Sequence, residues 1–104
     1  MMIARWSIDA KFGYKQSVID LMQRWTRDVA PQIGWTADRM RLLTGSIGAL
    51  EATVQSELLV KDLAELNAAW DKLATIQAHQ QWSKELEPHV VSGTNRWEIY
   101  RLLE

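Results

Sequence analysis

Residues 39–62, RMRLLTGSIGALEATVQSELLVKD, have the pattern of a β-hairpin. Before the glycines, every second residue falls on one side, in the set Met40, Leu42 and Thr44. After them, the same alternation runs through Ala52, Val54, Ser56, Leu58 and Val60. A period of two places successive side chains on opposite faces of a strand, and Gly45 and Gly48 provide a turn. We therefore expect two adjacent antiparallel strands in the middle of the chain.

The segments on either side of this hairpin each contain a helix pattern and a strand pattern. Residues 2–10 alternate, and residues 96–100 do so again. Between the strands, residues 14–30 and 63–76 carry hydrophobic side chains at the period of an α-helix. Pro31 ends the first helix. Asp62 and Glu65 have the spacing of a capping box at the start of the second, and a further helical stretch extends it to Pro88.

The resulting order, β-α-β-β-α-β, predicts an α+β, ferredoxin-like fold in one domain that spans residues 1–104. We expect a four-stranded antiparallel sheet in the order 4-1-3-2, with both helices on one face and the second helix extended. The strand residues expected to face the helices and form the core are Ala4, Trp6, Ile8, Met40, Leu42, Val54, Leu58, Trp97 and Ile99.

The helix-free face of this sheet is expected to be rich in arginine. Its charged and aromatic residues are Arg5, Arg39, Arg41, Glu57, Arg96, Glu98 and Tyr100. Arginine is suited to partly desolvated ion pairs, and the strand order allows pairs across neighbouring strands. One alternative is a face exposed to water, which antiparallel sheets tolerate. We expect instead that a second copy covers it and forms a twofold-symmetric dimer.

The composition excludes several classes of function. The 104 residues contain no cysteine, which excludes disulfides, zinc–thiolate sites and thiol catalysis. The formal net charge of −1 gives no electrostatic surface for nucleic acid or for an anionic membrane. No apolar run approaches the length of a membrane span, about 18 residues, and residues 1–13 lack the pattern of a signal peptide. We expect a cytoplasmic protein without a cofactor or metal that binds neither nucleic acid nor membrane.

Two long segments resemble a known superfamily. They are RLLTGSIGALEATVQSELLVKDLAELNAAW (residues 41–70) and HQQWSKELEPHVVSGTNRWEIYRLL (residues 79–103). With the spacing between them, they make the chain similar to the dimeric α+β barrel superfamily, and within it to NIPSNAP-like and antibiotic-biosynthesis-monooxygenase-like proteins. The resemblance implies a homodimer joined through its sheets. The superfamily includes cofactor-independent monooxygenases, haem-degrading enzymes and isomerases, so its name does not supply one reaction.

The six tryptophans suggest a ligand pocket. Four of them, Trp6, Trp25, Trp70 and Trp97, fall on faces expected to pack in the core. Trp35 and Trp82 fall in or near less regular segments and are better candidates for a pocket wall. We expect a cavity between sheet and helices that is rimmed by Trp35, Trp82, His79 and Tyr14. By resemblance to some superfamily enzymes, His79 is the candidate catalytic base.

Three functions remain open from the sequence. The first is a homodimer that binds a small apolar molecule between its sheet and helices. The second is a cofactor-independent monooxygenase or isomerase that acts on a hydrophobic small molecule. The third is a subunit that binds another protein through an exposed sheet edge.

Overall fold

The sheet has the predicted strand order. The structure, a computed structural model, describes residues 1–103. Its strands are β1 (Met2–Asp9), β2 (Met40–Thr44), β3 (Thr53–Val60) and β4 (Arg96–Arg101). Neighbouring strands are antiparallel, in the order β2-β3-β1-β4. This is the predicted order read from the opposite edge, so the ferredoxin-like arrangement is confirmed.

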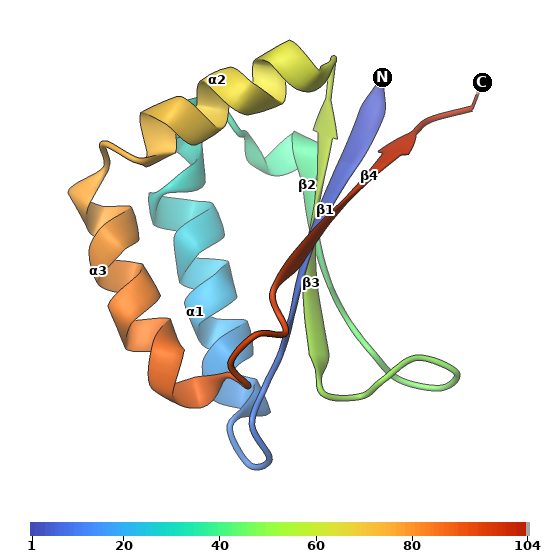
Figure 1. Ribbon diagram of the computed structural model, residues 1–104, viewed down its shortest axis with the longest axis vertical. Helices are drawn as coiled ribbons and strands as arrows, with labels where there is room; N and C mark the ends of the chain where they lie inside the picture. The colour runs from blue at the N-terminus through green and yellow to red at the C-terminus, as the bar shows by residue number, and fades with distance from the viewer. Residues whose placement is uncertain (104) are drawn as a thin grey trace.

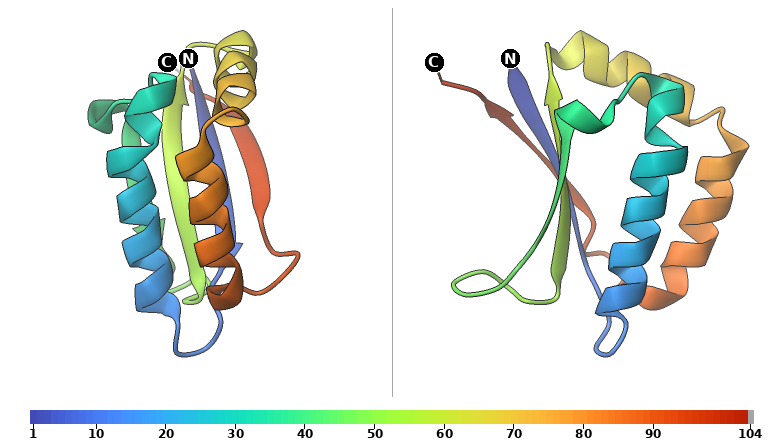
Figure 2. Two further views of the ribbon diagram at one scale, coloured as in Figure 1. Left: turned by 90° about the vertical axis from the view of Figure 1, so that its left-hand side faces the viewer. Right: turned by 180° about the vertical axis from the view of Figure 1, so that it is seen from behind.

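The helices all lie on one side of the sheet (Figure 1). They are α1 (Lys15–Asp28), α2 (Leu63–Leu73) and α3 (Gln77–Leu86). Three short 3₁₀ helices, η1 (Ala30–Ile33), η2 (Ala37–Arg39) and η3 (Glu87–His89), connect these elements. Helices α1 and α3 lie side by side, and α2 leads away from the end of β3 toward the start of α3 (Figures 1 and 2).

The predicted extension of the second helix is a separate helix. The break falls at Ala74–Ile76, where the Thr75 hydroxyl donates to the carbonyl of Lys72 at 2.7 Å and Ile76 has an extended backbone. A Thr hydroxyl that bonds to a backbone carbonyl three residues earlier competes with the helical hydrogen bonds. The chain therefore changes direction, and α3 comes to lie against α1 instead of continuing along α2.

The start of α2 is fixed by side-chain hydrogen bonds. The Asp62 carboxylate accepts from the backbone N–H of Glu65 at 2.9 Å, as predicted for the N-cap. The Glu65 carboxylate accepts from the backbone N–H of Lys61 at 2.6 Å and also pairs with Arg39. Arg39 was expected on the helix-free face. It lies in η2 instead and donates to the Leu59 carbonyl at 3.0 Å, so it fastens the start of β2 to the start of α2.

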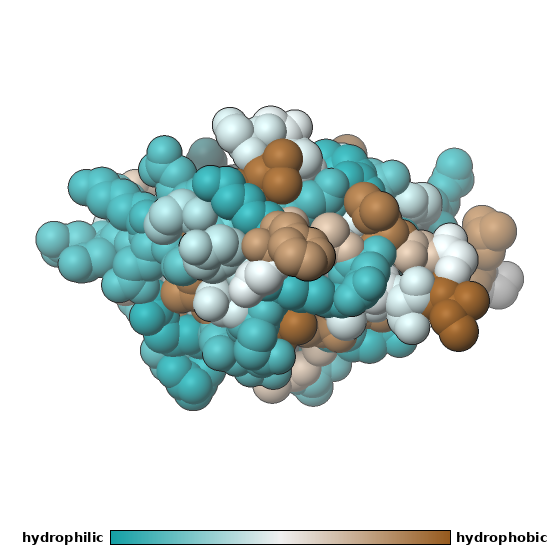
Figure 3. Space-filling model, turned by 90° about the horizontal axis from the view of Figure 1, so that it is seen from below, coloured by the Kyte–Doolittle hydropathy of each residue, from teal (hydrophilic) through white to brown (hydrophobic). Residues whose placement is uncertain are grey.

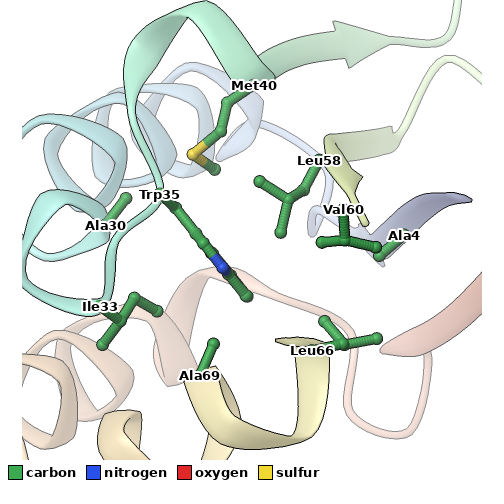
Figure 4. Close-up of a cluster of buried hydrophobic side chains, with 9 residues drawn as sticks. All are labelled: Ala4, Ala30, Ile33, Trp35, Met40, Leu58, Val60, Leu66 and Ala69. Atoms are coloured by element: carbon green, nitrogen blue, oxygen red, sulfur yellow. The ribbon is translucent and has the colours of Figure 1, made fainter. Parts of the chain in front are cut away.

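The core lies between the helices and the middle of the sheet. One buried cluster contains Ala4, Ala30, Ile33, Trp35, Met40, Leu58, Val60, Leu66 and Ala69 (Figure 4). A second contains Ile8, Ala10, Val18, Met22, Val54, Trp82, Leu86 and Val90. The prediction that Trp97 and Ile99 belong to the core is wrong, because they are 40% and 38% exposed. They point to the helix side, but β4 is an edge strand to one side of the helices (Figure 2).

Candidate functional site

A cavity of about 780 Å³ lies between the sheet and the helices. Its wall includes all six tryptophans of the chain, Trp6, Trp25, Trp35, Trp70, Trp82 and Trp97. They come from β1, α1, the η1–η2 connection, α2, α3 and β4. Small side chains, Ala4 and Ser56, lie on the helix-facing side of β1 and β3 and form part of the lining. Large rings opposite small residues leave space that neither layer fills.

Three of the four predicted rim residues line this cavity, and the fourth does not. Trp35 and Trp82 are buried, and His79 is half-buried. Tyr14 immediately precedes α1 and is 46% exposed, and its ring lies 5.3 Å from the ring of His89, outside the cavity. Its place at the helix N-terminus, after the turn at Gly13, carries it past the end of the cavity.

Four lining residues were missed because periodicity predicts them as packed core. Trp6, Trp25, Trp70 and Trp97 do face the other layer, as predicted, but they border the cavity. The small residues on the central strands are a signal that could have revealed this. Ala4 on β1 and Ser56 on β3 have short side chains. They cannot pack directly against a helix when indole rings lie between the helix and the sheet.

The aromatic rings of the wall form two groups, one centred on Trp25 and the other made of Trp70 and Trp97. The ring centroid of Trp25 lies 6.0 Å from that of Trp35 and 6.1 Å from that of Trp82, both tilted by about 50–60°. Trp70 and Trp97 meet edge to face at 5.2 Å. Tilted and edge-to-face arrangements are those that aromatic pairs prefer, and each such pair adds about 0.5–1.5 kcal/mol beyond its burial. These contacts hold the wall in a defined shape.

The neutral ring of His79 is held in one tautomer by its neighbours. The indole N–H of Trp25 donates to Nδ1 of His79 at 2.9 Å, and the His79 ring stacks on Trp82 at 5.9 Å. Burial lowers the pKa of His79 below its ordinary 6.5. A ring nitrogen that accepts a hydrogen bond carries no proton, so the neutral ring holds its proton on Nε2. His79 therefore offers a donor, Nε2–H, while its lone pair is engaged by Trp25.

Polar groups gather at one end of the cavity. Lys11, Glu87, Ser92 and Asn95 belong to its lining and are exposed to solvent. They come from the turn after β1 and from the segment between α3 and β4. Seen from below, this end of the molecule is mainly hydrophilic, with hydrophobic side chains that are scattered over it (Figure 3). The buried part of the lining is therefore apolar, and its exposed part contains polar side chains as well as Val91 and Trp97.

A row of alternating charges crosses the helix-free face of the sheet. The register aligns Arg41 of β2, Glu57 of β3, Arg5 of β1 and Glu98 of β4. Glu57 is only 5% exposed. It accepts from Arg5 at 2.5 and 2.9 Å and from Arg41 at 2.7 Å. Arg5 and Glu57 thus form an ion pair across neighbouring strands, of the kind that the strand order allows.

The row continues into a cluster on β4. The guanidinium of Arg5 lies 5.0 Å from the centre of the Tyr100 ring, a distance typical of cation–π contacts. The Tyr100 hydroxyl donates to Glu98 at 3.2 Å, and Arg96 lies 3.6 Å from the same carboxylate. Of the seven residues predicted for this face, six lie in this row or cluster. Arg39 lies in η2 and pairs with Glu65 instead.

Residues 1–103 bring no three His, Asp or Glu side chains together in a group that could hold a metal ion. No helix of the described chain has the length and hydrophobicity to cross a bilayer.

We predict that Glu57→Gln destabilises the fold in a pH-dependent way. Burial would raise the pKa of the Glu57 carboxyl, but Arg5 and Arg41 outweigh burial and hold that pKa below its ordinary 4.5. The ion pairs thus stabilise the fold fully above about pH 4.5, and this contribution is lost as the pH falls through the lowered pKa. Above pH 4.5, urea unfolding should show a loss of about 1–2 kcal/mol, since both arginines remain partly exposed.

The matched control is Glu85→Gln, which breaks the exposed pair with Arg24. It should cost less than about 1 kcal/mol. A difference between wild type and Glu57→Gln that persists unchanged below the lowered pKa would contradict this account.

The chain is similar in structure to several solved proteins, although no protein-family model and no curated protein matches it. A NIPSNAP family protein from Agrobacterium tumefaciens is 17% identical, with a TM-score of 0.81 over 99% of this chain and 86% of that one. SnoaB, a cofactor-independent oxygenase from Streptomyces nogalater, is 11% identical, with a TM-score of 0.69 over 99% of this chain and 93% of that one.

A third structure, a candidate antibiotic biosynthesis monooxygenase from Nitrosomonas europaea, is 8% identical with a TM-score of 0.69, and each chain is covered in full. At such low identity, likeness in structure defines the fold and leaves the activity open. The chain therefore has the ferredoxin-like fold of NIPSNAP and antibiotic-biosynthesis-monooxygenase-like proteins, in agreement with the resemblance in its sequence.

Proposed function

We propose that this protein is a homodimeric α+β barrel that binds a small apolar molecule in the tryptophan-lined cavity. The observation that carries the proposal is the cavity itself, of about 780 Å³ and bordered by all six tryptophans. Ligand sites in proteins commonly have volumes of about 300–1,000 Å³ and apolar, aromatic walls with few polar groups. The buried lining residues, among them Leu58, Trp35 and Trp82, are all hydrophobic.

We predict that Ser56→Phe blocks ligand binding. Ser56 lies in the lining on β3, so a phenyl ring there would project into the space between the layers. Binding of fluorene, a planar hydrocarbon, should weaken by at least about tenfold in equilibrium dialysis, a loss of about 1.4 kcal/mol. The matched control is Ser46→Phe, in the exposed loop between β2 and β3, which should bind fluorene as the wild type does. If fluorene binding does not saturate with the wild type or with either variant, the proposal is overturned.

The alternating charge row supports the homodimer. A twofold rotation about an axis parallel to the strands turns the sheet over and reverses the row. Arg41 then faces the partner's Glu98, and Glu57 faces the partner's Arg5, so unlike charges meet at every position. Such self-complementarity is what an interface between identical copies needs. Leu43 and Tyr100 beside the row are 39% and 43% exposed and add apolar area to the same face.

We predict that Arg41→Glu weakens the dimer. The change places two carboxylates opposite each other, and the dissociation constant measured by sedimentation should rise by about tenfold or more. Arg27→Glu, on an exposed part of α1, has the same change in charge and should leave it unaltered. Near-ultraviolet circular dichroism checks that both variants are folded.

A wild-type chain that sediments at its single-chain mass of 12.0 kDa at micromolar concentration would contradict the dimer. It would favour the third candidate, a subunit that binds another protein. The loop between β2 and β3, where Ile47 is fully exposed and Leu50 is 63% exposed, would then be the surface to test.

A second candidate function is a cofactor-independent oxygenase or isomerase. It is favoured by an ionisable group inside the apolar cavity, His79, and by the likeness in fold to SnoaB. The hydrogen bond from Trp25 occupies the lone pair that a base would use. For His79 to take a proton at Nδ1, this bond must first open, so the resting geometry favours binding over catalysis.

We predict that aromatic and polyketide-like compounds incubated with the protein in air are recovered unchanged, as read by mass spectrometry. Product that forms with the wild type and is lost in His79→Ala would favour the enzyme instead. Its rate should then rise with pH through a value below 6.5, because burial lowers the pKa of His79 and a base must be neutral. Equal product from both proteins would remove His79 from the mechanism.

A further inference from the structure

The loop between β2 and β3 holds hydrophobic side chains in contact with solvent. Ile47 is fully exposed and Leu50 is 63% exposed. The loop lies at the lower end of the sheet and bends away from the helices, toward the helix-free side (Figures 1 and 2). It therefore extends on the side of the sheet that carries the charge row.

This loop is closed at its base by backbone contacts. The N–H of Gly45 donates to the Thr53 carbonyl at 3.0 Å, and the N–H of Thr53 donates to the Leu50 carbonyl at 3.1 Å. A Cβ atom at Gly45 would lie 1.7 Å from the Leu50 carbonyl oxygen, so only glycine lets the two limbs of the loop come this close. Ile47 thus projects from the tip of a loop with a defined base, and does not pack on its own chain.

The charge row determines how a second copy fits against the sheet. A twofold axis along the row, perpendicular to the strands, would set each charge against the same charge of the partner, which is unfavourable. An axis parallel to the strands sets Arg41 against the partner's Glu98, and unlike charges meet. Rotation about this parallel axis leaves every residue at its own height along the strands. The hydrogen-bond register therefore predicts which segment of the partner lies opposite the loop.

The base of the loop lies at the same height as Val91, at the other edge of the sheet. Gly45 bonds to Thr53, and Thr53 pairs with Asp9 of β1. The Asp9 carbonyl in turn accepts from the N–H of Val91 at 2.8 Å. Since the rotation places β2 opposite the partner's β4, Gly45 comes to face the partner's Val91. Ile47 extends from Gly45 toward that segment.

The loop is long enough to reach the facing segment. Its eight residues, 45–52, lie between Thr44 of β2 and Thr53 of β3. Two limbs of four residues project by at most about 13 Å, and two sheets packed face to face lie about 10 Å apart. Val91 is 42% exposed and offers an apolar side chain at the place the loop reaches. It also belongs to the exposed part of the cavity lining.

We propose that the β2–β3 loop packs Ile47 and Leu50 on the partner's Val91, beside the exposed part of the partner's cavity lining. This inference rests on the proposed homodimer and specifies its contacts. Twofold symmetry forms the contact twice, because each copy both provides a loop and receives one. The contact lies outside the buried part of the cavity, so it should leave the affinity for fluorene unchanged.

Disulfide cross-linking tests this contact directly, because the chain has no cysteine of its own. Ile47→Cys combined with Val91→Cys, or with Ser92→Cys, should give a covalent dimer on a non-reducing gel after oxidation with copper–phenanthroline in air. A disulfide needs Cα atoms within about 7 Å. Within one chain, three inter-strand spacings, about 14 Å, separate the base of the loop from Val91. Ile47→Cys with Ala78→Cys, at an exposed position of α3, is the matched control and should run as single chains.

Sedimentation of the unlinked protein provides a second measurement. Ile47→Ser should raise the dissociation constant of the dimer by about tenfold or more, because each copy loses a buried apolar contact. Phe12→Ser removes a fully exposed side chain from the turn before α1 and should leave the constant unaltered. Dimers that form neither cross-link, or an unaltered constant in Ile47→Ser, would overturn this inference and leave the homodimer standing. A monomeric wild type would overturn the two together.

Discussion

The separation between the helices and the sheet depends on the indole rings that stand between them. Direct helix-on-sheet packing needs side chains that interdigitate at close range. Here the ring of Trp25 packs against the rings of Trp35 and Trp82 in the helical layer. The facing strands contribute residues as small as Ala4 and Ser56 to the lining. The rings pack against one another and leave the cavity between the helices and the sheet unfilled. The cavity and the placement of His79 both follow from this arrangement.

The two faces of the sheet differ in chemistry: one is apolar and the other carries ion pairs. On the helix side, the residues of β1 and β3 exclude water and define a space. On the other side, a single buried carboxylate, Glu57, is compensated by two guanidinium groups from neighbouring strands. One residue of register shift would exchange these faces. The charge row therefore opposes any slip that would expose the apolar side, whether or not a second molecule covers it.

The strand order, the hairpin and the N-cap at Asp62 could be predicted because alternation and capping are local signals. The break at Ala74–Ile76 could not, since that segment contains neither proline nor glycine. Periodicity correctly gave the direction of Trp97, but it cannot tell whether a helix extends over an edge strand. Alternation likewise assigned Arg39 to the sheet face, whereas η2 turns its side chain toward Glu65.

The cavity was only partly predictable for a related reason. A hydrophobic pattern identifies side chains that face another layer, and it contains no information on the distance between layers. Trp35 and Trp82 could be identified because they fall in or near less regular segments, and His79 was named by resemblance to superfamily enzymes. The other four tryptophans had the same periodicity that a closely packed core would produce.

The position of β4 has a consequence for how the chain folds. Within residues 1–103 it pairs with β1 alone, and their register joins Met2 to Arg101, so the pair closes across nearly the whole described sequence. Contacts of such high sequence separation carry the largest loop-closure entropy and tend to form late. Until they form, the outer edge of β1 has free backbone donors and acceptors that other chains could pair with. The interval before this closure is when the nascent domain is most vulnerable to aggregation.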